Sequence, residues 1–192
     1  MPACIPHRVQ SPRRPCPGVP SRQRGNALVF SMLSLVIGGI VLALGIGYYQ
    51  NAQANAQVQG TISEVSAIIG SAQQNYGQYG YSGLTTAVAV GSRVIPDSRA
   101  DSTGTSATDS YSGAITLVDN SGKTADTAIL TYANVPSSQC TQIVNGAQSL
   151  ARQVGVAGVD VKPLDASIDI VKLNTQCTSA PNVKIAFVFG RT

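Results

Sequence analysis

Residues 27–49 read ALVFSMLSLVIGGIVLALGIGYY, an uninterrupted apolar run that we call the apolar segment. No charged residue lies within it. A helix of this length, rising about 1.5 Å per residue, would be roughly 35 Å long and would cross the roughly 30 Å hydrocarbon core of a bilayer. The apolar segment therefore predicts a transmembrane helix, and the rest of the chain is divided into two sides by it.

Charge is distributed unevenly on those two sides. Of the 13 basic residues, five arginines lie within residues 1–25, which contain none of the nine acidic residues. A basic flank ahead of a membrane span indicates that this flank stays in the cytoplasm and that the rest of the chain lies beyond the inner membrane. Because the basic excess is confined to the flank, no nucleic-acid partner is expected for the rest of the chain.

Residues 1–25 contain six prolines and no hydrophobic periodicity, which is typical of a flexible leader rather than a folded domain. Cys4 and Cys16 have no zinc-ligand spacing, so we interpret them as free thiols. His7 is the only histidine of the chain. The part beyond Gly25 therefore lacks the residue on which His-based catalytic triads and His-rich zinc sites depend, and we expect no enzyme activity, cofactor or metal.

The helical pattern continues beyond the apolar segment, over residues 50–76. Apolar side chains recur there at alternating steps of four and three residues, which predicts one face buried against a domain: Val58, Ile62, Val65, Ile69, Ala72 and Tyr76. The glycine-rich sequence QQNYGQYGYSG (73–83) then ends the helix, and we expect its tyrosines, Tyr76, Tyr79 and Tyr81, to anchor a loop.

Residues 77–192 are expected to form a globular head with mixed α and β structure. The sequence predicts a surface loop over 96–113, and a helix that starts at Pro136–Ser138, continues through 143–154 and is capped by Gly155. Residues 84–90 suit a short helix or a strand equally well. Alternating or β-branched runs predict strands over 114–118, 128–133, 168–173 and 183–189, the first two as a hairpin and the last inside the sheet. The fold class is thus α+β, with a long N-terminal helix on an antiparallel sheet of four or five strands.

Cys140 and Cys177 are the only cysteines beyond the leader. In an exported domain such a pair is most simply a structural disulfide, whereas a redox pair would have C-x-x-C spacing. Asp160, Asp165 and Asp169 match no EF-hand spacing and are interpreted, with Lys162, as solvated residues of a turn and a strand.

Two features of the apolar segment concern assembly and processing. Gly39, Ala43 and Gly47 are four residues apart, so they form a stripe of small side chains that lets another helix approach closely; the alternative is that they reflect the glycine content of transmembrane helices in general. Cleavage is possible either before the segment, at Gly25, or after it, at an Ala-x-Ala site over 52–54. The second alternative would fit a secretory signal, but the apolar run is too long for one.

The basic leader ending in Gly25, the apolar helix that continues into an amphipathic half, and the two cysteines of the second half resemble a type IV pilin. The stretches NAQVQGTISEVSAIIGSAQQNYG, YSG, IPDS and YSGAITLV resemble the type IVb group, specifically PilS-like pilins. The resemblance implies a type IV pilin fold, with a leader (1–25) removed after Gly25 by prepilin peptidase and methylation of the new N-terminus at Asn26. It also implies helices bundled at the centre of a homo-oligomeric filament, with a Cys140–Cys177 disulfide in the head.

The same resemblance implies a function: a pilus subunit that is inserted in the inner membrane through residues 26–49 and polymerised by the pilus assembly machinery into a cell-surface fibre for adhesion, aggregation or conjugation. One position departs from the family pattern, because Phe30 occupies the fifth mature position, where a glutamate is usual. A charge in the bilayer is costly unless it is paired, and here that pair is missing. The alternatives are therefore a minor or tip pilin, a pseudopilin, or a membrane-anchored periplasmic binding module that does not polymerise.

Overall fold

The computed structural model describes residues 24–120 and 126–190, and the chain divides into two compact units, Met1–Tyr48 and Tyr49–Thr192. We call the second one the folded unit. The residues expected to form a leader, with Cys4, His7 and Cys16, lie almost wholly outside the described residues, as do residues 121–125 between the two strands of the expected hairpin.

One helix, α1 (Arg24–Tyr76), contains both the apolar segment and the amphipathic stretch that follows it. The expected stripe is confirmed in the folded unit, where Val58, Val65, Ile69 and Ala72 are buried, each with at most 2% of its surface exposed, while Ile62 and Tyr76 pack against the core. The helix ends in a turn in which the amide of Gly77 donates to the Gln73 carbonyl oxygen (2.8 Å). The periodicity of the sequence was sufficient to predict this helix because the pattern is local.

The three tyrosines at the end of α1 and in the loop that follows do not all anchor this loop. Tyr81 is buried and packs edge-on against Phe189, with ring centroids 5.6 Å apart. Tyr76 donates a hydrogen bond from its hydroxyl to Ser92 (2.8 Å). The expectation for Tyr79 was wrong, because 88% of its surface is exposed.

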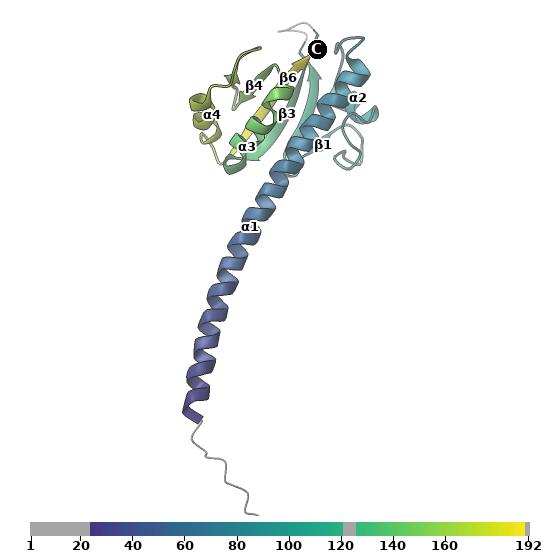
Figure 1. The fold of residues 1–192 in the computed structure, drawn as a ribbon. Helices are drawn as coiled ribbons and strands as arrows, with labels where there is room; N and C mark the ends of the chain where they lie inside the picture. Colours follow the sequence, from purple (N-terminus) through teal and green to yellow (C-terminus); the bar gives the residue numbers. More distant parts are fainter. Residues whose placement is uncertain (1–23, 121–125, 191–192) are drawn as a thin grey trace, which may run out of the picture. The chain divides into compact units, whose positions relative to one another are not determined.

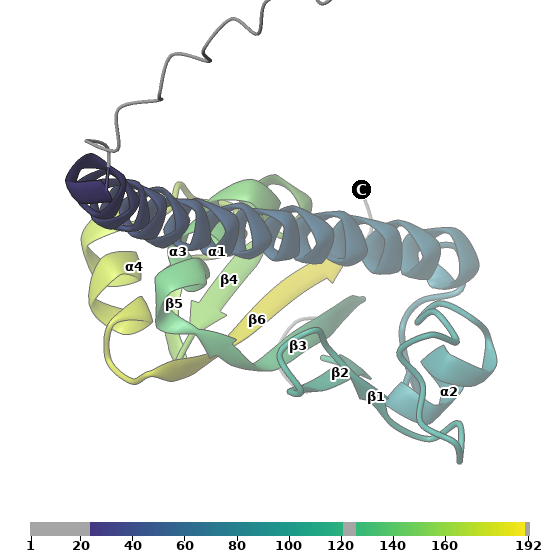
Figure 2. The same cartoon turned by 90° about the horizontal axis from the view of Figure 1, so that it is seen from below.

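Beyond α1 the folded unit combines short helices with one antiparallel sheet in the order β1-β2-β3-β6-β4-β5. Figures 1 and 2 show α3 and the second half of α1 on the same face of this sheet. The elements are α2 (Thr86–Gly91), β1 (Ala107–Thr108), β2 (Ala114–Asp119), β3 (Thr127–Pro136), α3 (Ser137–Ala147), the 3-10 helix η1 (Gln148–Leu150), β4 (Gln153–Val156), β5 (Val159–Lys162), α4 (Ile170–Cys177) and β6 (Asn182–Gly190). The α+β class is confirmed, as are the β2–β3 hairpin and the central position of β6.

The segment 168–173, expected to be a strand, is instead the start of helix α4. The Asp169 side chain accepts hydrogen bonds from the amides of Val171 and Lys172, both 3.1 Å, and so caps the helix. Leu173 and Cys177, four residues apart, then turn to the core and are fully buried. The alternating sequence had suggested a strand, but a cap and an i, i+4 buried pair define a helix.

The helix expected over 143–154 is shorter than predicted and starts at Ser137, where the sequence had placed its beginning. After Ala147 the chain changes to η1 and then to strand β4, in which Val154 pairs with Phe187 of β6. Gly155 lies in this strand and is not a helix cap. Pairing with β6 outweighs the helical spacing of the apolar residues, and the β4–β5 hairpin brings the sheet to six strands in the described residues, not four or five.

The hydrophobic core lies between α1, α3 and the inner face of the sheet. Alternate residues of the central strands point into it, including Leu117 of β2, Leu130 of β3 and Phe187 of β6, all without exposed surface. The helices approach closely at Gly146 of α3, where a Cβ atom would lie 2.4 Å from Cδ1 of Ile62 on α1. This core holds the second half of α1 in the folded unit.

Candidate functional site

The described side chains of the apolar segment, residues 28–49, are all exposed. Large apolar side chains along its whole length are exposed by more than half of their surface, from Phe30 (73%) to Tyr48 (79%). Monomeric soluble proteins rarely expose a continuous apolar surface of this size, and such surfaces mark contacts with membranes or other proteins. The apolar segment is therefore the candidate functional site of the chain.

The polar groups of the apolar segment are satisfied within the helix. The hydroxyl of Ser31 donates to the Leu28 carbonyl oxygen and that of Ser34 to the Ser31 carbonyl oxygen, both at 2.9 Å. A serine that bonds back to its own helix presents little polarity to the surroundings. The surface offered by this segment is thus apolar and suited to lipid or to another apolar helix.

Among the described residues, one helix is long and apolar enough to cross a membrane, judged by length and composition: Leu28–Tyr76, with a mean hydropathy of 2.5 in its most apolar window and none of that window buried. A signal sequence near an N-terminus can have the same properties. This observation agrees with the span expected from the sequence.

The predicted assembly residues lie on α1, on the exposed segment. Phe30 and Ala43 are exposed, and Cβ atoms added at Gly39 and Gly47 would meet nothing within 4 Å. Within residues 24–120 and 126–190, no group therefore fills the small-residue stripe at Gly39 and Gly47. Gly25 and Asn26 lie in the first turns of α1, and their side chains are outside the described part of the structure.

Glu64 is the only acidic residue of α1, and its carboxylate accepts hydrogen bonds within the folded unit. Its Oε2 atom accepts two hydrogen bonds from Arg99, one from Nη2 (2.7 Å) and one from Nε (3.0 Å), and its Oε1 accepts one from the hydroxyl of Tyr132 (3.3 Å). Arg99 also donates to the Ser110 hydroxyl (2.6 Å). These hydrogen bonds hold the segment between α2 and β2 against α1.

The Glu64–Arg99 pair is largely shielded from solvent. The Glu64 and Arg99 side chains are only 11% and 29% exposed. Burial raises the pKa of the Tyr132 hydroxyl, and the adjacent Glu64 carboxylate raises that pKa further. Tyr132 therefore remains a neutral donor to the carboxylate at physiological pH.

A second contact joins the same elements through Tyr111. Its hydroxyl donates to Oε1 of Gln139 on α3 (2.5 Å) and accepts from the Thr61 hydroxyl of α1 (3.3 Å). Burial raises the pKa of the Tyr111 hydroxyl, while the hydrogen bond from Thr61 lowers it. We call Glu64, Arg99, Tyr111 and Tyr132 the polar hub; no pattern in the sequence predicted that these four residues would lie close together. The one signal that could have drawn attention to this region is that Glu64 is the sole glutamate of the chain and lies on the helix with the buried stripe.

We expect the Glu64–Arg99 pair to contribute measurably to stability. Glu64→Gln should lower the free energy of unfolding by about 1–3 kcal/mol, because it leaves the half-buried guanidinium without a charged partner. Chemical denaturation of the full chain in detergent measures this, and a double-mutant cycle with Arg99→Gln should show a coupling energy of about 1–2 kcal/mol.

The matched control for that cycle is the pair of Arg93 and Asp97, whose side chains are 81% and 71% exposed with N···O at 3.7 Å. Its coupling energy should stay below about 0.5 kcal/mol, since solvent screens exposed pairs. Equal coupling in the two pairs would show that burial does not strengthen the Glu64–Arg99 contact.

The two cysteines of the head, Cys140 on α3 and Cys177 at the end of α4, form a disulfide with a Cα–Cα distance of 5.6 Å. Both residues are fully buried. The disulfide joins two short helices that lie 37 residues apart in the sequence, as expected from the cysteine count. Its position in the core agrees with a structural role.

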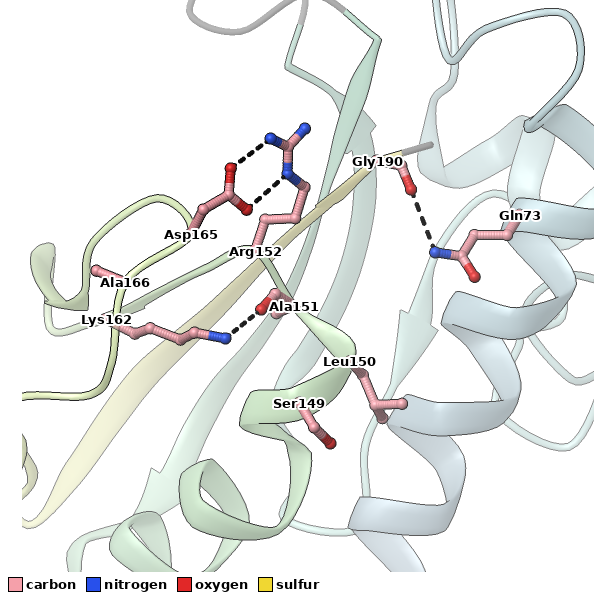
Figure 3. Close-up of a pocket in the computed structure, with 9 residues that line it drawn as sticks. All are labelled: Gln73, Ser149, Leu150, Ala151, Arg152, Lys162, Asp165, Ala166 and Gly190. Atoms are coloured by element: carbon pink, nitrogen blue, oxygen red, sulfur yellow. Dashed lines mark hydrogen bonds and ion pairs between the residues drawn. The ribbon is translucent and has the colours of Figure 1, made fainter. Parts of the chain in front are cut away.

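A pocket of about 330 Å³ is lined by residues of α1, η1, β5 and β6 and of the loops before β4 and after β5 (Figure 3). Arg152 forms a forked ion pair with Asp165, with N···O distances of 3.0 and 2.5 Å. The Lys162 ammonium donates to the carbonyl oxygens of Gln148 (2.7 Å) and Ala151 (2.6 Å). The charged groups of this pocket are thus paired within the fold, which indicates a structural role for them.

The aspartates considered at the sequence level do not converge on one site. Asp165 binds Arg152, which lowers the pKa of Asp165, and Asp169 caps α4. Asp160, on β5, lines a pocket of about 390 Å³ together with residues of the strands β2, β3, β4 and β6. In the described residues, no group of three or more His, Cys, Asp or Glu side chains is placed to hold a metal ion.

The fold and the site define a class: an α+β protein whose N-terminal helix begins as an exposed apolar segment and ends as part of the core. Residues 54–189 match the protein family described as PilS N terminal. The chain therefore belongs to this family, and the resemblance to PilS-like proteins is confirmed.

Among curated proteins, the chain is similar to the major structural subunit of bundle-forming pilus from Escherichia coli O127:H6 (strain E2348/69 / EPEC) and from Escherichia coli O111:H-. Each is 28% identical over 122 residues, and the alignment covers 63% of this chain and 63% of the relative. The chain thus spans less than two thirds of the length of these relatives. Among solved structures, TcpA, a type IV pilin from Vibrio cholerae El Tor biotype, gives a TM-score of 0.43 at 16% identity, covering 67% of this chain and 98% of TcpA.

Proposed function

We propose that this chain is a structural subunit of a type IVb pilus, which polymerises through the apolar segment of α1. The observation that carries the proposal is the exposure of that segment over residues 28–49, in a chain whose second unit has its own core. An exposed apolar helix of this length needs lipid or other copies of itself around it. The printed names of the curated relatives, as major structural subunits of a pilus, support filament formation.

The proposal has a sequence of steps. The chain first enters the inner membrane with the apolar segment as its span and with the folded unit in the periplasm. Prepilin peptidase then removes residues 1–25 and leaves Asn26 as the methylated N-terminus. The pilus assembly machinery finally transfers the helix from lipid to the centre of a homo-oligomeric cell-surface filament, where apolar helix faces pack against each other. In this role the chain is not an enzyme and binds no cofactor.

The small-residue stripe is the part of the apolar segment where we expect a neighbouring helix to pack most closely. At Gly39 and Gly47 the helix surface has no side chain and nothing else within 4 Å of the Cβ positions, so the backbone of another helix can approach closely there. Phe30 occupies the position where the family usually has glutamate, so apolar packing has to supply the assembly energy. This departure favours the minor-subunit form of the proposal over the major one.

The experiment tests processing and assembly separately. Mass spectrometry of sheared filaments should show a chain that starts at Asn26. Leu35→Lys should reduce filament yield at least tenfold, because a lysine in the middle of an apolar helix costs about 3 kcal/mol in lipid or in a helix bundle. Ser102→Lys, in an exposed loop of the folded unit, is the matched control and should leave the yield unchanged.

A second candidate function is a periplasmic binding module anchored permanently by α1. It is favoured by the absence of any acidic residue ahead of Glu64 in the sequence. The two functions differ in two measurements: an anchored module would retain residues 1–25 and would sediment with membranes as a single chain, without filaments. Finding both results would overturn the pilus proposal.

A further inference from the structure

Asp109 is the first residue of a tight turn between β1 and β2, and hydrogen bonds within the turn join its two ends. Its amide donates to the Gly113 carbonyl oxygen (2.8 Å), and its Oδ1 atom accepts from the amides of Tyr111 (2.8 Å) and Gly113 (2.7 Å). Only 6% of the surface of Asp109 is exposed. The sequence had placed this residue in a surface loop, whereas the structure encloses its carboxyl group.

The other carboxyl oxygen of Asp109 is buried beside acceptors. In the part of the chain that the structure describes, Oδ2 receives no hydrogen bond. A Cβ atom on Gly113 would lie 2.9 Å from this Oδ2 and 1.8 Å from the carbonyl oxygen of Ala133, so both oxygens pack against the same side of Gly113. A buried ionised oxygen without a donor costs more free energy than a protonated one, because the protonated group is neutral and its O–H can donate to a neighbouring acceptor.

The titratable groups of this region are Glu64 on α1, Arg99 in the segment after α2, and the tyrosines of the polar hub. Arg99 is the cation of this cluster, and its guanidinium is directed to Glu64 and Ser110. Tyr111 and Tyr132 carry no charge at neutral pH, because burial raises the pKa of both hydroxyls. Two carboxyl groups therefore share one cation, and Glu64 has the direct contact.

We propose that Asp109 is a proton-binding site of the folded unit, which takes up a proton in mild acid and thereby strengthens the attachment of the 109–113 turn to α1 and α3. The step is a simple proton transfer from solvent to Oδ2, with no other bond made or broken. Burial raises the pKa of Asp109 above its ordinary value of 3.8, and the amides of Gly113 and Tyr111 and the charge of Arg99 oppose that rise in part.

The turn that holds Asp109 is connected by hydrogen bonds to α1, α3 and β3, so the protonation state of Asp109 affects these contacts. Ser110 binds Arg99, Tyr111 binds Gln139 and Thr61, and Asn134 of β3 donates to the Tyr111 carbonyl oxygen (2.9 Å). Because the pKa of Asp109 is higher in the folded than in the unfolded chain, the folded state binds the proton more tightly. The free energy of unfolding therefore rises as the pH falls through the pKa that Asp109 has in the folded chain. This gain is complete below pH 3.8, where Asp109 is protonated in both the folded and the unfolded chain.

Two measurements on the full chain in detergent test the proposal. The ¹³C chemical shift of the Asp109 carboxyl carbon, followed by NMR, should titrate with a midpoint above 3.8. The melting temperature of the unmodified chain, measured against that of Asp109→Asn, should rise by about 2–4 °C between pH 8 and pH 4.5. The asparagine keeps an oxygen for the two turn amides and replaces the protonated Oδ2 by a neutral donor.

Asp97→Asn, in an exposed pair, is the control and should leave the pH profile of the unmodified chain unchanged. A midpoint at or below 3.8 would overturn the proposal, since Asp109 would then stay ionised, for example with a water molecule on Oδ2. Should Asp109→Asn not fold, the titration of the unmodified chain still decides.

Discussion

Replacing Cys140 and Cys177 together by alanine is expected to lower the free energy of unfolding by about 4 kcal/mol. The disulfide closes a loop with a sequence separation of 37 residues, and the chain-entropy model gives this value for such a loop. Alanine is chosen because both positions have no exposed surface, so that serine would add the separate cost of a buried hydroxyl. Urea denaturation of the full chain in detergent measures the difference.

The effect should concentrate on α4. This helix has eight residues and buries Leu173 and Cys177, while Ile170 and Val171 are 71% and 77% exposed. Such a short helix holds its place through the disulfide to α3 more than through apolar contacts. Amide hydrogen exchange should therefore become much faster in α4 than in the central strands β3 and β6.

Reduction supplies the control for the disulfide prediction. A reducing agent should destabilise the unmodified chain by a similar amount and leave the double-alanine variant unaffected. A loss below about 1 kcal/mol in the double variant would contradict the prediction and would mean that packing alone secures α4.

The second large effect is expected at Gly113, the last residue of the turn that holds Asp109. In Gly113→Ala the new Cβ atom would lie 1.8 Å from the backbone carbonyl oxygen of Ala133 on β3 and 2.9 Å from the Asp109 carboxylate. A backbone atom cannot move aside as a side chain can, so the β2–β3 pairing or the turn has to give way. We expect a loss of about 3 kcal/mol or more, visible as a lower melting temperature.

Gly60→Ala is the matched control, because it makes the same chemical change on α1 where a Cβ atom would meet nothing within 4 Å. Alanine favours a helix over glycine by about 1 kcal/mol, so this variant should be slightly more stable than the unmodified chain. The prediction for Gly113 fails if both variants shift the melting temperature in the same direction.

Much of the fold could be predicted from local patterns. The length of α1, its buried stripe, the hairpin of β2 and β3, and the central strand β6 all follow from periods of 3.6 or 2 residues and from the apolar content of short runs. The cysteine pair was also predictable, because an exported domain with two cysteines has one simple use for them. These features depend on neighbours along the chain or on composition.

Other features depend on contacts between distant residues, and the sequence patterns there were ambiguous or misleading. Val154 has helical spacing from Ile143 and Ala147 but lies in β4, because β6 offers a strand edge for pairing. Residues 168–173 alternate like a strand but form α4, where Asp169 caps the helix and Cys177 reaches α3. Local propensities differ by a few tenths of a kcal/mol, and tertiary pairing outweighs them.

The sequence by itself determined the candidate functional site: an apolar helix without charge, 23 residues long, which follows a stretch with five arginines and no acidic residue. It determined this because transfer from water to an apolar environment depends on composition and length alone. Only the tertiary structure decided that the sole glutamate pairs with Arg99 and that the carboxyl group of Asp109 is buried. Glu64 and Arg99 are 35 residues apart in the sequence and come into contact only after the core has formed. The burial of a charge depends on which distant groups fold around it, and no local pattern records that.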